Sequence, residues 1–144
     1  MRLTRFTDYS LRVLIYLGQN IESRVTIHQI SEAYGISKNH LMKVVSNLTR
    51  SQFVVAQRGP GGGIQLNRSP EEIGLNEVIA NTEKHLQQTD NPEQVDSTAD
   101  TRLSSYLQLA LNAYLDALGH YSLADILGTE SEAVDLLSLN EKAA

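Results

Sequence analysis

Two helix-forming segments separated by a single glycine constrain the fold of this chain most strongly. Thr26 is placed to cap a first helix, Gly35 to end it, and Ser37 to cap a second one. These signals predict helices over residues 27–34 and 38–51. Helices joined by so short a turn cross at a steep angle, so the positions at the crossing must be apolar or small. In a helix-turn-helix these positions are Ile30, Tyr34, Ile36, Leu41 and Val44, with the small Ser31 where the helices approach most closely.

The outer face of the second helix is polar. It combines cations, amides and an imidazole, which are groups that reach phosphates and base edges in DNA. The pattern therefore favours DNA binding, although an ordinary helical hairpin with a solvated polar face is the alternative. The side chains of the second helix that are expected to face solvent are those of Lys38, Asn39, His40, Lys43, Asn47 and Arg50. The residues of this motif expected to contact DNA are Thr26, His28, Ser37, Lys38, Asn39, His40, Lys43, Asn47 and Arg50.

A glycine-rich hairpin is predicted directly after the second helix. Past residue 51 the apolar pattern changes from helical to alternating, and the strand-like segments FVVAQR and GIQLNR flank the turn GPGG. A phosphate-cradling nucleotide loop is disfavoured, because such a loop opens a helix and here the chain continues as a strand. A hairpin in this position is typical of a DNA-binding wing that enters a minor groove, although a plain glycine hairpin is the alternative. The wing residues expected to contact DNA are Arg58, Gly59, Gly61 and Gly62.

Three more segments have helical periodicity. Residues 7–18 predict a mostly buried helix, with Thr7 placed as its cap and Gly18 as its end. Residues 73–85 predict a short amphipathic helix. Residues 102–118 carry apolar side chains on two adjoining faces, so one face can pack on the core and the other on a partner.

Charge is distributed unevenly along the chain. Up to Arg68 the sequence has nine basic and three acidic residues, whereas the remainder has three basic and fourteen acidic ones. A basic half joined to an acidic half suggests that the first half faces a polyanion. Uneven drift of surface charge explains the same split equally well.

Composition narrows the class of protein. With 144 residues, the chain is long enough for one core, or for one domain and a separate dimerisation element. No apolar run approaches the roughly 18 residues of a membrane helix, and the N-terminus lacks the apolar core of a signal peptide. We therefore expect a cytoplasmic protein. No local motif pairs a nucleophile with a base, so an enzyme is the class least expected and no catalytic residue is assigned.

Three segments, taken in order and spacing, carry a resemblance to a known family. They are LTRFTDYSLRVLIYLG, GISKNHLMKVVSNL and VVAQRGPGGGIQL, and they resemble the Rrf-two family of bacterial winged-helix regulators. The similarity extends from residue 1 to about 127, since HYSLADIL resembles the segment that closes the family's dimerisation helix. The resemblance implies a mainly α fold with a small β-hairpin, arranged as a winged helix-turn-helix head and a long dimerisation helix. It also implies a homodimer that binds a palindromic operator, with dimer contacts at Leu103, Leu107, Leu111, Tyr114 and Leu118.

The loop that holds an iron–sulfur cluster in some members of the family lacks its ligands here. In those members three cysteines bind the cluster; the matching positions of this chain are Asp90, Val95 and Thr101, and the chain has no cysteine. We therefore expect no cluster, no metal and no other cofactor, and a colourless protein. Asp8 matches a position that supplies a further ligand from the other subunit in related proteins, but here we expect it to pair with Arg12.

The same loop is rich in carboxylates. The stretch QQTDNPEQVDSTADTRL, residues 87–103, lacks the ligand spacing and the turn glycine of a calcium loop. Solvated charge is therefore favoured over a site for a hard cation. We expect residues 87–100 to be mobile or poorly ordered. The carboxylates are Asp90, Glu93, Asp96 and Asp100.

These interpretations divide the chain into four parts. They are a winged helix-turn-helix DNA-binding domain over 1–85, an acidic loop over 86–101, a dimerisation helix with its closing segment over 102–127, and a tail over 128–144. The favoured function is a sequence-specific DNA-binding regulator, most simply a homodimeric repressor whose effector, a small molecule or a protein, is not a cysteine-ligated cluster. The alternative is a protein-interaction adaptor that uses the acidic half and keeps a vestigial DNA-binding head.

Overall fold

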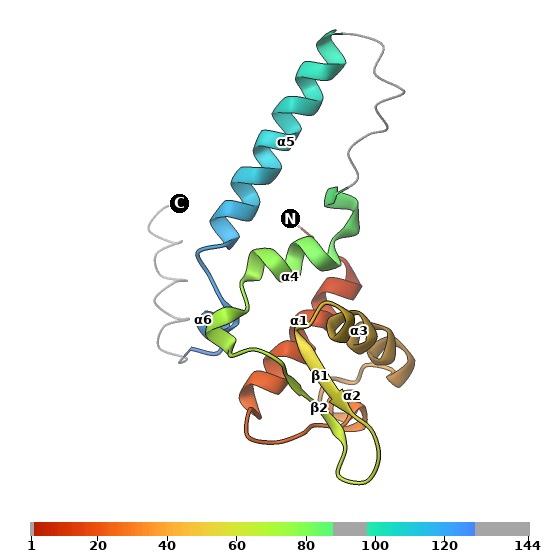
Figure 1. Cartoon of the computed structure of the whole chain (residues 1–144). Coiled ribbons are helices and arrows are strands. Elements are labelled where there is room, and N and C mark those ends of the chain that lie inside the picture. The colour runs from red at the N-terminus through yellow and green to blue at the C-terminus, as the bar shows by residue number, and fades with distance from the viewer. Residues whose placement is uncertain (1, 88–97, 129–144) are drawn as a thin grey trace.

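The computed structural model describes residues 2–87 and 98–128. Over these ranges the chain is mainly helical with one two-stranded antiparallel hairpin, which confirms the expected fold class. Figure 1 shows a head formed by α1 to α4 and the hairpin, from which α5 projects as a long separate helix. In chain order the elements are α1 Arg5–Gln19, α2 Ile27–Tyr34, α3 Lys38–Arg50, β1 Val54–Gln57, β2 Gly63–Leu66, the 3-10 helix η1 Pro70–Glu72, α4 Leu75–Thr82, the 3-10 helix η2 Lys84–Gln87, α5 Thr98–Leu118 and α6 Leu123–Ile126.

The helix-turn-helix formed by α2 and α3 has the predicted caps. The Thr26 hydroxyl caps α2 by accepting from the Gln29 N–H, while the Gln29 side chain accepts from the Thr26 N–H at 2.8 Å. Gly35 ends α2 in the left-handed conformation, and Ser37 caps α3 by accepting from the His40 N–H. Capping depends on residues within one turn of the helix end, so these boundaries follow from the local sequence.

Apolar side chains fill the crossing of α2 and α3. Four of the five predicted positions are buried, namely Ile30, Ile36, Leu41 and Val44. The fifth, Tyr34, is only half-buried, because its ring lies at the edge of the crossing against Tyr16 and under the Arg12 guanidinium. Ser31 donates its hydroxyl hydrogen to the Ile36 carbonyl at 2.7 Å, which closes the turn between the helices.

Helix α1 differs from its prediction at both ends. Thr4 is the cap, because its side chain accepts from the Thr7 N–H. Thr7, the predicted cap, is fully buried and donates its hydroxyl hydrogen to Thr82 of α4 at 2.9 Å. Gly18 lies inside the helix, which continues to Gln19, and it packs closely against the end of the Leu127 side chain.

The predicted hairpin is present and is joined to the helix-turn-helix. β1 and β2 pair antiparallel, with Val54 opposite Leu66. Ile64 of β2 also exchanges two backbone hydrogen bonds with Val25, at 2.9 and 2.7 Å. Since Val25 directly precedes the cap of α2, this bridge fixes the hairpin relative to the start of that helix.

The segment after α5 returns the chain to the head. Leu123 of α6 is 1% exposed and belongs to the main apolar core. Its N–H donates to the Ile73 carbonyl at 2.8 Å, and the Leu75 N–H donates to the Tyr121 carbonyl at 2.9 Å. These two hydrogen bonds pair Ser122 with Gly74, the residue that precedes α4. The segment HYSLADIL therefore packs as part of the head.

Helix α5 contributes nothing to the buried core. It has no buried residue along its 21 positions, and it begins at Thr98 where the sequence predicted 102. In the described part of the chain, no helix is both long and apolar enough to cross a bilayer. The tail from residue 129 and most of the acidic loop expected to be mobile, residues 88–97, lie outside the described residues.

Candidate nucleic-acid interface

The outer face of α3 is exposed and positively charged. Lys38, Lys43 and Arg50 are exposed, and none of them forms an ion pair with another described residue. Asn39 and His40 are exposed in the first turn of the same helix. The face therefore offers three cations and two hydrogen-bonding side chains to a polyanion.

Met42 also lies on this face, although it was not among the residues expected to contact DNA. Its side chain is 57% exposed, next to Lys43 and one turn after Asn39. A single exposed apolar side chain is common on a protein surface. Apolar side chains on helices that lie in a major groove contact thymine methyl groups.

Asn47 is the one predicted residue of α3 that does not face solvent, so that expectation is wrong. It is 8% exposed, and its Nδ2 donates to Oδ1 of Asn81 in α4 at 2.7 Å. Asn81 in turn donates to the Ser51 hydroxyl at 2.7 Å. Asn47 follows the buried Val44 by three positions, which puts both side chains on one side of the helix. The amide therefore fastens α3 to α4.

The N-terminal ends of α2 and α3 carry three further predicted residues. Thr26, His28 and Ser37 are all exposed, and the hydroxyls of Thr26 and Ser37 serve as the caps. Backbone N–H groups at a helix N-terminus carry partial positive charge. These ends therefore suit contact with phosphate groups along a DNA backbone.

The tip of the hairpin is open to solvent. Arg58, Gly59 and Gly61 are exposed, and Arg58 forms no ion pair with a described residue. Gly59 and Gly61 have φ angles of 91° and 70°, in the left-handed region that favours glycine. Gly62 is half-buried and donates its N–H to the Gly59 carbonyl at 2.9 Å. The tip thus combines one free cation with a narrow, accessible backbone.

The dimer contacts expected on α5 fall into two groups. Leu111, Tyr114 and Leu118, near the head, are half-buried. The outer half of the helix carries large apolar side chains that are each more than half exposed; they are Leu103, Tyr106, Leu107 and Leu109. Neither Tyr106 nor Leu109 was among the predicted contacts. This outer half is therefore an exposed apolar surface.

The residues of this chain do not fit a thiolate-ligated cluster. No cysteine is present, and no three His, Asp or Glu side chains of the described ranges are grouped so that they could hold a metal ion. Asp8 pairs with Arg12 at 3.0 Å, as predicted. Of the positions that match the cluster ligands, Thr101 lies in α5, and Asp90 and Val95 lie outside the described residues.

Known sequences similar to this chain are transcriptional regulators. A family model, Rrf2, described as an iron-dependent transcriptional regulator, matches residues 3–129. The HTH-type transcriptional regulator NsrR of Bacillus licheniformis is 43% identical over 143 residues, which cover 96% of this chain and 100% of that protein. NsrR of Bacillus subtilis is 40% identical over 146 residues, which cover 98% of this chain and 100% of that protein.

Solved structures share the fold at lower identity. CymR, the global cysteine regulator of B. subtilis, has a TM-score of 0.69 at 21% identity, over 88% of this chain and 96% of that one. IscR of T. potens has a TM-score of 0.67 at 21% identity, over 88% of this chain and 86% of that one. The arrangement of helices and hairpin is therefore one that known proteins adopt.

Proposed function

Because the chain belongs to the Rrf2 family, and is thus a DNA-binding transcriptional regulator and not an enzyme, we propose that it is a homodimeric repressor. It binds a palindromic operator through α3 and the wing. It acts in the cytoplasm and responds to a signal other than a cysteine-ligated cluster. The observation that carries the proposal is the set of exposed cations on α3 and the wing tip, none of which forms an ion pair with a described residue.

The geometry of α3 supports its role as the recognition helix. One side of the helix is buried in the head, while the opposite side presents its cations and amides to solvent. Such a helix fits the major groove, where base edges are distinguishable. Arg58, at the tip of the wing, suits the negative potential of a narrow minor groove.

The unpartnered apolar surface of α5 supports the homodimer. A helix of 21 residues is about 30 Å long. Burying its four exposed apolar side chains stabilises an assembly by about 25 cal/mol per Å² of area removed from water. A second copy of α5 offers the same surface, and a two-fold axis between the copies relates the two heads. Two heads related in this way match the inverted halves of a palindrome.

The nature of the signal is proposed from the chemistry of the chain. The family model is described as iron-dependent. This chain has no thiol, and thiolates are the ligands that hold iron–sulfur clusters in proteins. The signal is therefore a small molecule or a protein that binds the dimer and changes the separation of its heads.

An adaptor with a vestigial head is the weaker alternative. A head that no longer binds DNA has to keep its buried core in order to fold, but it has no need of free cations. Here Lys38, Lys43, Arg50 and Arg58 are all exposed without a described carboxylate partner. Their exposure supports a head that still binds a polyanion.

Selection from a pool of random DNA duplexes tests the proposal. The full chain should enrich one sequence, and that sequence should be an inverted repeat with its half-sites about one helical turn apart, near 10 base pairs. Enrichment of a single half-site would argue against the dimer. No enrichment over a pool recovered without protein would remove the proposed function.

A further inference from the structure

Helix α3 exposes one large apolar side chain, that of Met42. The structure describes this helix along its whole length, and its other large apolar residues are buried, namely Leu41, Val44, Val45 and Leu48. Met42 is 57% exposed and belongs neither to the apolar core nor to the half-buried residues packed against it. Packing of the head therefore does not account for an apolar residue at this position.

Polar residues suited to DNA surround Met42 on the exposed side of α3. Lys38 and Asn39 lie one turn before it and Ser46 lies one turn after it, and all three residues are exposed. Residues three and four positions apart in a helix are neighbours on its surface. Met42 therefore lies within the polar face proposed to contact DNA.

Met42 also lies in the part of α3 that is placed to read bases. It is in the second turn of this helix of 13 residues. In helix-turn-helix proteins the N-terminal residues of the recognition helix contact base edges, while phosphate contacts fix the position of the helix. Leu41 and Val44, close to Met42 in sequence, are 0% and 1% exposed. The backbone that carries Met42 is therefore anchored in the core of the head.

The thioether of Met42 suits one feature of a base pair. It donates no hydrogen bond and accepts one only weakly, so it gains little from the polar groups of base edges. Thymine alone among the four bases of DNA presents a methyl group in the major groove, at C5. An unbranched Met side chain adapts its shape to such a neighbour.

We propose that Met42 contacts the C5 methyl group of one thymine in each half-site of the operator and thereby selects thymine at that position. The contact removes apolar surface of both groups from water, and unmodified cytosine, adenine and guanine offer no methyl group in its place. Selection of thymine rests on the proposed function, because it requires α3 to lie in a major groove.

Exchange of thymine for uracil in the selected operator tests the contact. Uracil pairs with adenine in the same way and keeps the O4 acceptor, so the exchange removes only the C5 methyl group. Each duplex carries uracil at one thymine position of both half-sites, and fluorescence anisotropy measures its affinity for the full chain. Loss of one buried methyl group corresponds to about a fourfold change in affinity, so loss of two should weaken binding about 15-fold at one position of the half-site.

Two results of this scan would overturn the Met42 contact while leaving the proposed function intact. The first is a selective operator in which every thymine position tolerates uracil with less than about a twofold change in affinity. The second is a selected operator whose half-sites contain no thymine. The scan uses the wild-type chain, so its result does not depend on the folding of any variant.

Variants assign the methyl contact to its residue. Met42→Ala lacks the long thioether chain and should bind the thymine operator and the uracil operator equally well. Met42→Leu keeps a large apolar side chain and should retain a preference for thymine. Ile21→Ala is the matched control, because it shortens a side chain that is 49% exposed and lies outside α3, and it should keep the full preference. An unchanged preference in Met42→Ala, or an equal loss in Ile21→Ala, would overturn the assignment to Met42.

Failure of the Met42 contact is distinguishable from failure of the proposed function. A chain that enriches no DNA sequence would remove both, because no operator would then exist. A chain that selects an inverted repeat, with a uracil effect that Met42→Ala leaves in place, would remove only the Met42 contact. An unchanged midpoint of urea unfolding is expected for Met42→Ala, since the side chain is exposed.

Discussion

The backbone N–H of Thr4 donates a hydrogen bond to Oε1 of Glu83 at 2.8 Å, and the Thr4 hydroxyl donates to the same oxygen at 3.0 Å. These bonds join the cap of α1 to the residue that ends α4, 79 positions along the chain. Glu83 is 2% exposed, and Nδ1 of His85 lies 3.1 Å from its other carboxylate oxygen. A buried carboxylate therefore holds together two helices of the head.

Replacing this carboxylate should cost stability in a pH-dependent way. Burial alone raises the pKa of Glu83, but the adjacent Thr7 hydroxyl, the hydrogen bonds from Thr4 and the nearby His85 outweigh it, so the pKa lies below its ordinary value of 4.5. A lowered pKa in the folded state stabilises the fold above the ordinary pKa, and that contribution is lost as the pH falls through the folded-state pKa. Glu83→Gln should lower the free energy of unfolding by about 1–3 kcal/mol near pH 7. Urea unfolding should show a smaller difference at low pH.

A control variant and a second readout accompany the Glu83→Gln experiment. Glu71→Gln removes an exposed carboxylate of η1 and should change the free energy of unfolding by less than about 0.5 kcal/mol. Burial, and then the charge of Glu83, raise the pKa of Tyr114 on α5. Glu83→Gln should therefore move the Tyr114 titration back toward its ordinary pKa. A destabilisation that stays the same at low pH would show that the charge of Glu83 is not involved.

Asn47 should matter for stability more than for DNA contact. Asn47→Ala leaves the part-buried Oδ1 of Asn81 without its donor and should lower the free energy of unfolding by about 1–3 kcal/mol. Asn39→Ala, on the exposed side of α3, should cost less than about 0.5 kcal/mol but weaken operator binding. Urea unfolding and fluorescence anisotropy with labelled DNA measure the two effects. The double variant Asn47→Ala/Asn81→Ala tests the contact itself. If its loss of free energy of unfolding equals the sum of the losses in the two single variants, the two amides do not interact.

The features that could be predicted from the sequence are those set by near neighbours along the chain. The caps at Thr26, Gly35 and Ser37 depend on one turn of helix, and the hairpin depends on alternation around a glycine turn. The exposed cations of α3 followed from the same periodicity. For this reason the main outline of the candidate DNA-binding face was available before the structure.

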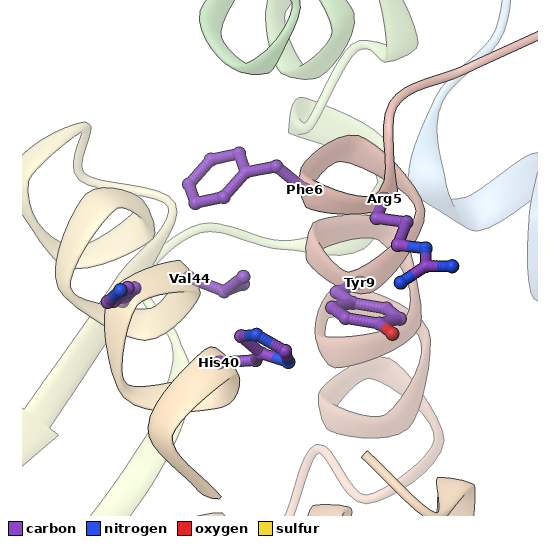
Figure 2. A pocket seen from close by; sticks show the side chains of 6 residues that line it. Arg5, Phe6, Tyr9, His40 and Val44 are labelled. Carbon is purple, nitrogen blue, oxygen red and sulfur yellow. The ribbon is translucent and has the colours of Figure 1, made fainter. Parts of the chain in front are cut away.

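The features that were missed depend on contacts between distant segments. Helical periodicity shows which face of a helix is apolar, but not which polar residue finds a partner on another element. Two of the errors involve such a partner, namely Thr7 with Thr82 and Asn47 with Asn81. A half-open pocket between α1 and α3 was missed for the same reason, since each helix supplies one of its walls; Phe6 and Tyr9 face His40 and Val44 across it (Figure 2).

The proposed dimer should depend on the outer half of α5. Leu107 is 59% exposed, so Leu107→Glu places a charge on the apolar surface without disturbing the head. It should weaken the dimer at least about 100-fold, because a buried unpaired charge is costly. Gln108→Glu adds the same charge at the neighbouring exposed position and should have little effect. Sedimentation equilibrium measures both, and equal dissociation constants for the two variants would place the dimer interface elsewhere.

Contact of α3 and the wing with DNA is tested most directly by the salt dependence of affinity for the selected operator. Wild type should prefer the operator to a scrambled duplex at least about 1,000-fold. Lys43→Gln and Arg58→Gln should each weaken binding and reduce the magnitude of the log–log salt slope by about 1, since each removes one phosphate contact. Lys84→Gln, which removes an exposed cation of η2, should change neither quantity. Equal affinity for operator and scrambled DNA, or the same slope for all three variants, would contradict binding through α3 and the wing.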